Sequence, residues 1–426
     1  SLLVIGLAGC GDEAEPSTTT AAAPATTEAP STTAPADTTT TAAGESTTTS
    51  VAEEAPLEGL PPDPDNVLAQ LPRLARENYV GYPGEVRASP WADYEGRPGP
   101  YKIGLVGLAA NSAFTVNFYN EIRSQFEEAK AAGLVEGELL EGINPDQATE
   151  TPAMQVASFQ NMVRQGVDGV IFLPLATDAL VSAIDKAGEE NQVPSVVHGN
   201  TCDALYSIPM VTLNNLDAHA KLIEMLGGQG KVVMVRGIPG VPWETACWEG
   251  IQRLVEANPG IEIVGEITGN WNNADAKTGM LQFLAGYPGQ IDAVFQNGIM
   301  AQGIIQAFEQ LGRQVPPIAL TGAQAGDLAW FRDHVADGYD TYGLAYNAKQ
   351  SGSVCFDILL RTLAGKGPIV RDVSMKAVLV TKDNVANMVA PEATLNTVDD
   401  PLGEVEDYCT DEFLDMFFKV PGNPVP

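Results

Sequence analysis

Two residues suited to holding a small ligand, Trp271 and Asn297, each follow an apolar run that is typical of a buried strand. The two runs span 261–267 and 291–295. An indole ring offers a flat apolar face on which the apolar face of a sugar, or a planar ligand, stacks, and a primary amide both donates and accepts hydrogen bonds. We therefore interpret Trp271 as a ligand plate and Asn297 as a polar anchor.

The segment 261–311 supplies the elements that position these two residues. Strand, loop and helix alternate twice along it, with Gly286 ending the first helix and Gly312 following the second. Such a unit implies a parallel sheet with right-handed crossovers, in which ligands bind at the carboxyl ends of the strands. We expect Trp271 and Asn297 to meet there, at one edge of a cleft.

The resemblance to a known family becomes specific in this segment. The stretch GNWNNADAKTGMLQFL, followed by IDAVFQNGIMAQGIIQAF, resembles the distal-lobe core of periplasmic sugar-binding proteins of the ribose-binding type. In that family an aromatic at the position of Trp271 and an asparagine at that of Asn297 touch the sugar. The similarity runs from about 101 to about 380 and implies an α/β fold, with two doubly wound parallel-sheet lobes joined by a three-crossing hinge (a type I periplasmic binding protein).

The resemblance and the alternation of apolar and helical patterns divide the chain into lobes and flanking segments. We expect a helix at 152–164 and a second-lobe strand at 375–380. The expected boundaries are 101–213 and 347–365 for the first lobe, 214–345 and 375–390 for the second, 55–100 for a packed N-terminal arm, and 391–426 for a C-terminal tail.

Further ligand contacts follow from the resemblance. Asn111 and Phe114 fall on the first strand-to-helix loop, which supplies an asparagine and aromatics to the sugar in the family. Asn200 stands where the family usually has an Asp-Arg pair, and is a partial substitute. The remaining candidates lie beside other expected strand ends or helix starts: Trp243, Glu244, Gln324 and Asn347.

Four polar anchors that grip the sugar in the family are changed in this sequence. The resemblance therefore implies the cleft but does not identify the ligand. Thr245 to Cys247 occupy the region of a binding arginine, and an aspartate and a glutamine of the family are replaced near Gln324 and Asn347. A site built to pair hydroxyls discriminates against ligands that leave its buried polar groups unpaired. The ligand is expected to be a small polar molecule, a sugar or sugar-like compound.

Each aromatic and polar candidate also has a structural alternative. Core packing is the alternative for the tryptophans; loop placement favours binding for Trp271, while both roles stay open for Trp243. Glu244 equally suits a helix N-terminus, where the helix dipole favours a negative charge. For Asn297 the alternative is a turn-forming role, which we favour less than binding.

The N-terminal residues predict a lipid anchor and a tether. Residues 1–10 end in Leu-Ala-Gly-Cys, which resembles a bacterial lipobox, so we expect Cys10 to be acylated at the end of a signal peptide. The alternative is a chance apolar N-terminus. Residues 11–54 are almost wholly Thr, Ala, Pro, Ser, Glu and Asp, a composition that predicts a disordered tether. The expected location is extracytoplasmic, on the cell membrane.

Composition excludes several classes of function. The 426 residues carry a formal net charge of −32, which argues against nucleic acid as a partner. The three histidines show no metal-site spacing, and no catalytic arrangement or dinucleotide loop is recognisable. We therefore expect no enzyme activity, no metal and no cofactor.

Four cysteines remain after Cys10, which allows three pairings in an oxidising compartment. We favour a disulfide between Cys355, on the helix after the second crossing, and Cys409 in the tail. A Cys202 to Cys247 bond would tie the lobes together and restrict closure unless it lay close to the hinge.

The sequence as a whole predicts a monomeric, lipid-anchored solute-binding protein. It would deliver its ligand to the permease of an ABC importer by closing the cleft. The nearest alternative is a binding component of a sensory receptor, which shares the fold. A surface enzyme is a further alternative, for which a catalytic constellation in the cleft would be needed.

Overall fold

The computed structural model describes residues 56–146, 149–199, 201–212, 216–345, 347–401 and 410–424. The lipobox with Cys10 and the tether 11–54 lie outside these residues, as do Asn200 and Cys409. The two lobes, the N-terminal arm and the C-terminal helix all belong to one compact unit, 56–426.

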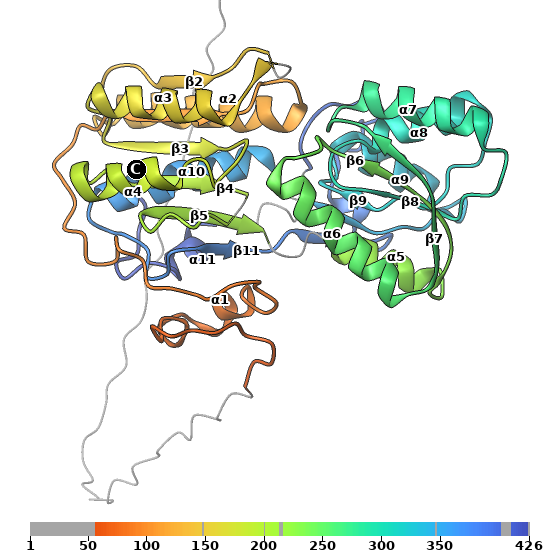
Figure 1. The fold of residues 1–426 in the computed structure, drawn as a ribbon, viewed down its shortest axis with the longest axis horizontal. Helices are drawn as coiled ribbons and strands as arrows, with labels where there is room; N and C mark the ends of the chain where they lie inside the picture. Colours follow the sequence, from red (N-terminus) through yellow and green to blue (C-terminus); the bar gives the residue numbers. More distant parts are fainter. Residues whose placement is uncertain are drawn as a thin grey trace, which may run out of the picture. The chain divides into compact units, whose positions relative to one another are not determined.

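The first lobe is built on a six-stranded parallel sheet, in the order β11-β5-β4-β3-β1-β2 (Figure 1). Its central strands are apolar along their whole length because helices cover both faces. The strands are β1 (Ile103–Gly107), β2 (Leu140–Ile143), β3 (Gly169–Leu173), β4 (Ser195–His198), β5 (Ser207–Thr212) and β11 (Val373–Met375).

Alternate residues of these strands enter two separate cores. Leu105 packs with α2 (Ala113–Ala131) and α10 (Ala348–Leu363) on one face. Val106 packs with α3 (Pro152–Arg164) and α4 (Val181–Asn191) on the other. The lobe therefore has three layers, helices, sheet and helices, as the doubly wound prediction requires.

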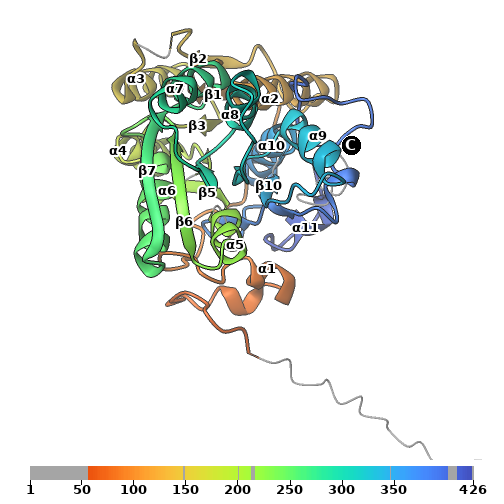
Figure 2. The same cartoon turned by 90° about the vertical axis from the view of Figure 1, so that its right-hand side faces the viewer.

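The second lobe repeats this layering. Strands β7-β6-β8 form a parallel set, and β12-β10-β9 form a mixed set in which β12 is antiparallel; a bridge between Val294 and Ile318 links the two sets. The helices α5 and α6 share one core with the sheet, and α7, α8 and α9 share the other (Figure 2). The strands are β6 (Gln229–Arg236), β7 (Gly260–Thr268), β8 (Ala293–Gln296), β9 (Leu320–Thr321), β10 (Gly343–Ala345) and β12 (Val378–Val380). The helices are α5 (Asp217–Met225), α6 (Pro242–Ala257), α7 (Asn273–Gly286), α8 (Ala301–Gln310) and α9 (Ala325–His334).

The segment 261–311 folds as the sequence predicts. The side chain of Asn272 caps α7 by accepting hydrogen bonds from the backbone N–H groups of Ala274 and Asp275, at 2.8 and 3.2 Å. The strand, loop, helix unit then repeats through β8 and α8. The predicted helix at 152–164 is also confirmed.

Two parts of the fold differ from the prediction. The single second-lobe strand expected at 375–380 is wrong: β11 pairs with β5 in the first lobe and β12 pairs antiparallel with β10 in the second, because the chain crosses between lobes at Lys376 and Ala377. The strand β5 was not predicted; it contains Pro209, a residue type that is rare in central strands. The chain thus passes between lobes three times, after β5, after β10 and between β11 and β12.

The N-terminal arm packs along the β11 edge of the first-lobe sheet. The Tyr82 hydroxyl donates to the buried carboxylate of Asp372 at 2.7 Å, and the Trp91 indole donates to the carbonyl of Tyr206 at 3.0 Å. The arm contains a 3₁₀ helix, Leu68–Gln70, and α1, Arg73–Glu77. The Asn78 amide of the arm also donates to the carbonyl of Ser374 in β11 at 3.1 Å, and so pairs a backbone group at an edge that would otherwise be open.

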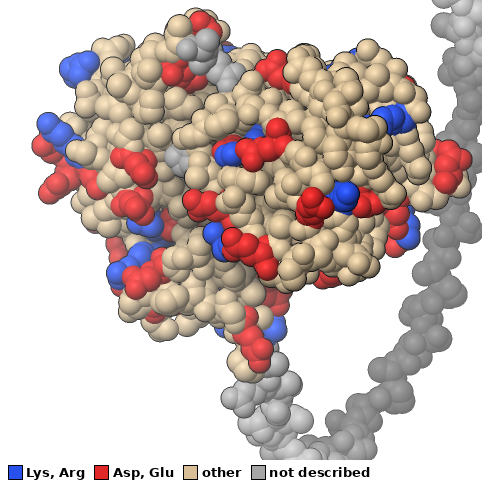
Figure 3. Space-filling view, turned by 45° about the vertical axis from the view of Figure 1, so that its right-hand side comes forward, with Lys and Arg blue, Asp and Glu red and all other residues tan. Residues whose placement is uncertain are grey.

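The C-terminal tail contains α11, Asp411–Asp415, whose Asp411 and Asp415 pair with the buried guanidinium of Arg361 on α10. None of the helices in the described part of the chain is long and apolar enough to cross a membrane. On the face drawn in Figure 3, lysines and arginines are few and lie mostly beside acidic side chains, so this face has no basic patch.

Candidate ligand-binding site

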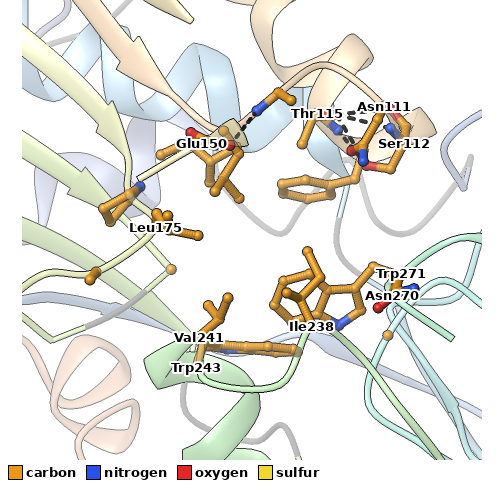
Figure 4. A pocket seen from close by; sticks show the side chains of 18 of the residues that line it. Asn111, Ser112, Thr115, Glu150, Leu175, Ile238, Val241, Trp243, Asn270 and Trp271 are labelled. Carbon is orange, nitrogen blue, oxygen red and sulfur yellow. Dashed lines mark hydrogen bonds between the residues drawn. The ribbon is translucent and has the colours of Figure 1, made fainter. Parts of the chain in front are cut away.

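A cavity of about 420 Å³ lies where loops from the two lobes face each other (Figure 4). Its volume falls within the range of small-molecule pockets. The loops follow the carboxyl ends of β1, β3, β4, β5, β6, β7 and β8, or precede α3. This is where an open parallel sheet places its ligands.

The second-lobe wall of the cavity is aromatic. The rings of Trp243 and Trp271 have centroids 5.7 Å apart and planes inclined at 58°. The Trp271 indole N–H donates to the carbonyl of Asn297 at 3.2 Å, which fixes the ring. Glycine at 237 makes room for it, because a Cβ there would lie 2.2 Å from the indole nitrogen. Both tryptophans are half-buried and line the cavity, as a ligand plate requires.

The first-lobe wall is held by the start of α2. The Ser112 side chain caps this helix by accepting from the backbone N–H of Thr115 at 3.2 Å, and so orders the loop that carries Asn111. The ring of Phe114 lies 5.5 Å from that of His198, centroid to centroid. The structure therefore brings the predicted residues Asn111, Phe114, Trp243 and Trp271 to one cavity.

His198 lines the cavity as a neutral imidazole. Burial lowers the pKa of His198 to about 4, so the ring is uncharged at neutral pH. Its Nδ1 has no hydrogen-bond partner among the described residues. The ring therefore brings a buried polar atom, and no charge, to the wall.

Glu150 is a cavity residue that was not predicted from the sequence. One carboxylate oxygen accepts from the backbone N–H of Ala109 at 3.1 Å, and the other accepts from the Gln155 amide at 3.0 Å. Gln155 in turn accepts from the backbone N–H of Leu175 at 2.9 Å. Burial raises the pKa of Glu150. The sequence signal that could have indicated Glu150 as a cavity residue was its place in the loop before α3, at the carboxyl edge of the sheet.

Glu244 and Asn297 lie behind the aromatic wall and do not line the cavity. Glu244 is fully buried, and Arg236 donates to both of its oxygens, at 2.7 and 2.9 Å. The Asn297 amide donates to the same carboxylate at 3.3 Å. Because Asn297 also accepts the Trp271 indole N–H, Glu244 anchors the network that supports Trp271.

Two other predicted residues cap helices away from the cavity. Gln324 forms a capping box with Asp327 at the start of α9. Asn347 caps α10 by accepting from the backbone N–H of Gln350 at 3.0 Å, and donates to the carbonyl of Pro401. Their ligand contacts, like those of Glu244, Asn297 and Asn200, stay predictions.

The lining is mainly apolar, and its polar members are neutral except for Glu150. No lysine or arginine is among the described residues that line it. The described ranges also contain no cluster of three or more His, Cys, Asp or Glu that could hold a metal. The chemistry available is therefore stacking, hydrogen bonding and one carboxylate.

Comparison with known proteins gives the family. The family described as "Periplasmic binding protein domain" matches residues 103–367. A putative rhizopine-binding protein of Rhizobium meliloti is 28% identical over 253 residues, 57% of this chain and 80% of the relative. A xylitol-binding protein of Mycolicibacterium smegmatis is 26% identical over 185 residues, 42% of this chain, and the match spans about half of that relative, 53%.

Solved structures agree on the fold. An ABC transporter solute binding protein from Thermobispora bispora superposes with a TM-score of 0.61 at 21% identity, over 76% of this chain and 99% of that one. A second, from Bacillus halodurans with bound myo-inositol, has a TM-score of 0.56 at 21% identity, over 67% and 96%. The family is one of binding proteins, in agreement with the expectation that the chain is not an enzyme. The chain belongs to the periplasmic binding protein domain family.

Proposed function

We propose that this chain is an extracytoplasmic solute-binding protein that takes a sugar or polyol into its cleft and delivers it to an ABC importer. The cavity carries the proposal: loops of both lobes line it, with two tryptophans on one wall and polar side chains on the other. The names of the relatives, which bind xylitol, rhizopine or ribose, support this ligand class.

The expected binding mode follows from the two walls. A ring or folded polyol lays its apolar C–H face on Trp243 or Trp271, and its hydroxyls pair with Asn111, Ser112 and Asn270. A ligand that contacts both walls favours the closed arrangement of the lobes over the open one. Closure at the three crossings would then present the surface that a permease recognises.

We also propose that the protein is a monomer anchored to the membrane by lipid on Cys10. The support is the lipobox pattern and the Thr/Ala/Pro-rich tether 11–54.

The Cys355–Cys409 disulfide remains a prediction of the same kind. In the structure Cys202, Cys247 and Cys355 are buried with free thiols, so no disulfide forms among the described residues; Cys409 lies outside them.

A thermal-shift screen of pentoses, hexoses, linear polyols and inositols tests the proposal. A ligand at 100 times its dissociation constant stabilises the folded protein by about 2.7 kcal/mol, which is readily detected. We expect at least one neutral polyol or sugar to raise the melting temperature. Sugar phosphates should not, because none of the described residues that line the cavity is a lysine or arginine. Stabilisation by anions, with none from any sugar or polyol, would contradict the proposal.

A further inference from the structure

Glu150 is the charged side chain of a cavity that is otherwise neutral. Of the described residues that line it, none is a lysine or arginine, and His198 is uncharged at neutral pH. The Glu150 carboxylate is half-buried at the wall opposite the tryptophans (Figure 4). Among the described lining residues, an occupant of the cavity therefore meets one carboxyl group and no cationic side chain.

This charge has no counter-ion within the described part of the chain. Both hydrogen bonds that Glu150 accepts come from neutral donors, the Ala109 backbone and the Gln155 amide. The Glu244 carboxylate behind the aromatic wall contrasts with it, because Arg236 pairs with both of its oxygens. A carboxylate that is partly withdrawn from water and lacks a cation raises the free energy of the empty site, and a cationic ligand group would lower it.

The carboxylate has spare acceptor capacity and a fixed position. Its two oxygens offer about four lone-pair sites, of which the Ala109 and Gln155 donors use two. Gln155 is itself held by the backbone of Leu175, so three cleft segments orient the group. An ammonium group could donate to the remaining sites without displacing either neutral donor.

The side chains on the remaining walls indicate which other groups the ligand should have. Ile238, Val241 and Trp243 face Glu150 across the cavity and suit the C–H face of a ring or polyol. The buried Nδ1 of His198, without a partner among the described residues, adds a polar atom that a hydroxyl can pair with. The walls therefore fit a molecule with a positive group, an apolar face and hydroxyls.

We propose that the ligand is an amino sugar or amino polyol whose protonated amine pairs with Glu150. This inference rests on the proposed function and narrows its ligand class. It further implies that N-acetylation of the ligand, which removes the charge, weakens binding.

The test is calorimetric titration with matched sets that differ only at one substituent: D-glucosamine, D-glucose and N-acetyl-D-glucosamine, D-glucamine and D-glucitol, and an inosamine with its inositol. Each set is titrated into the unaltered protein, into Glu150→Gln, and into Glu138→Gln. Glu138 is exposed and lies outside the cavity, so its variant is a control for the loss of one negative charge in the same lobe.

We expect the free amine of at least one set to bind the unaltered protein and the Glu138→Gln control about tenfold more tightly than the neutral members of its set. In Glu150→Gln the amine and the neutral members of its set should bind with about equal affinity. The comparison of amine with N-acetyl compound needs no variant, so it decides the question even if Glu150→Gln fails to fold.

Three results would overturn the inference. If neutral members bind as tightly as their amines, the proposed function stands and the role of Glu150 is wrong. The role of Glu150 is equally wrong if Glu150→Gln keeps the preference for the amine. If no member of any set binds, both the inference and the proposed sugar or polyol ligand are contradicted.

Discussion

Arg236 offers the sharpest test of how the aromatic wall is supported. Its guanidinium donates to both oxygens of Glu244 and, at 2.8 Å, to Glu266. Replacing it by glutamine (Arg236→Gln) leaves the Glu244 carboxylate buried without its cation. The Asn297 amide, at 3.3 Å, then remains as its neutral donor.

The magnitude follows from the burial of the pair. Removing one partner of a buried ion pair costs about 3–5 kcal/mol. The Glu244 side chain is 0% exposed, but that of Arg236 is 17% exposed, so water can reach part of the vacated space. We therefore expect the free energy of unfolding to fall by about 3 kcal/mol, the low end of the range. The double variant Arg236→Gln/Glu244→Gln should recover part of this loss, because no charge is then left buried.

Chemical denaturation followed by circular dichroism measures these values for both single variants and the double variant. Arg123→Gln is a matched control, since Arg123 pairs with Glu141 on the exposed surface and its loss should cost less than about 1 kcal/mol. A cost below about 1 kcal/mol for Arg236→Gln, or no coupling in the cycle, would refute the reasoning.

Three further predictions concern the site, the pH dependence and the anchor. Trp271→Ala should weaken ligand binding by at least about 1 kcal/mol in calorimetry, and Trp271→Phe by less because it keeps an aromatic face; equal affinity of all three proteins would contradict a stacking role. Burial raises the pKa of Asp327 to about 7, above the ordinary value near 4, so its contribution to stability is present below about pH 4 and is lost as the pH rises through 7. Asp327→Asn should therefore be more stable than the unaltered protein by at least about 1 kcal/mol at pH 8, with the difference vanishing toward pH 4; a difference that does not change with pH in denaturation experiments would show the pKa of Asp327 to be ordinary. Cys10→Ser should release the protein from membranes of its host in cell fractionation, and complete retention would contradict the lipid anchor.

The layered fold and several of the residues that line the cavity could be predicted from the sequence, because both depend on local signals. The Asn272 cap and the alternation of strands with helices predict which loops meet at the carboxyl edge, and Trp271, Asn111 and Phe114 lie on such loops. Glu150 was missed because a carboxylate in a loop is usually solvated, and only the folded chain brings Gln155 and the Ala109 backbone to it.

Other residues were assigned to the ligand because two uses of one side chain share a sequence pattern. Gln324 and Asn347 follow strands and precede helices, which suits a cleft residue and a helix cap alike, and the structure uses both as caps. The pairing of Arg236 with Glu244 depends on how β6 and α6 pack, so spacing along the chain did not indicate it.

The central claim, that this cleft holds a small polyhydroxylated ligand, is tested most directly by a crystal structure of the protein with the tightest ligand from the screen. We predict ligand density between the Trp243 and Trp271 rings on one side and Asn111 and Glu150 on the other, with the two lobes closed around it. Density at any other surface, or a ligand that touches one lobe and leaves the cavity open, would contradict the claim.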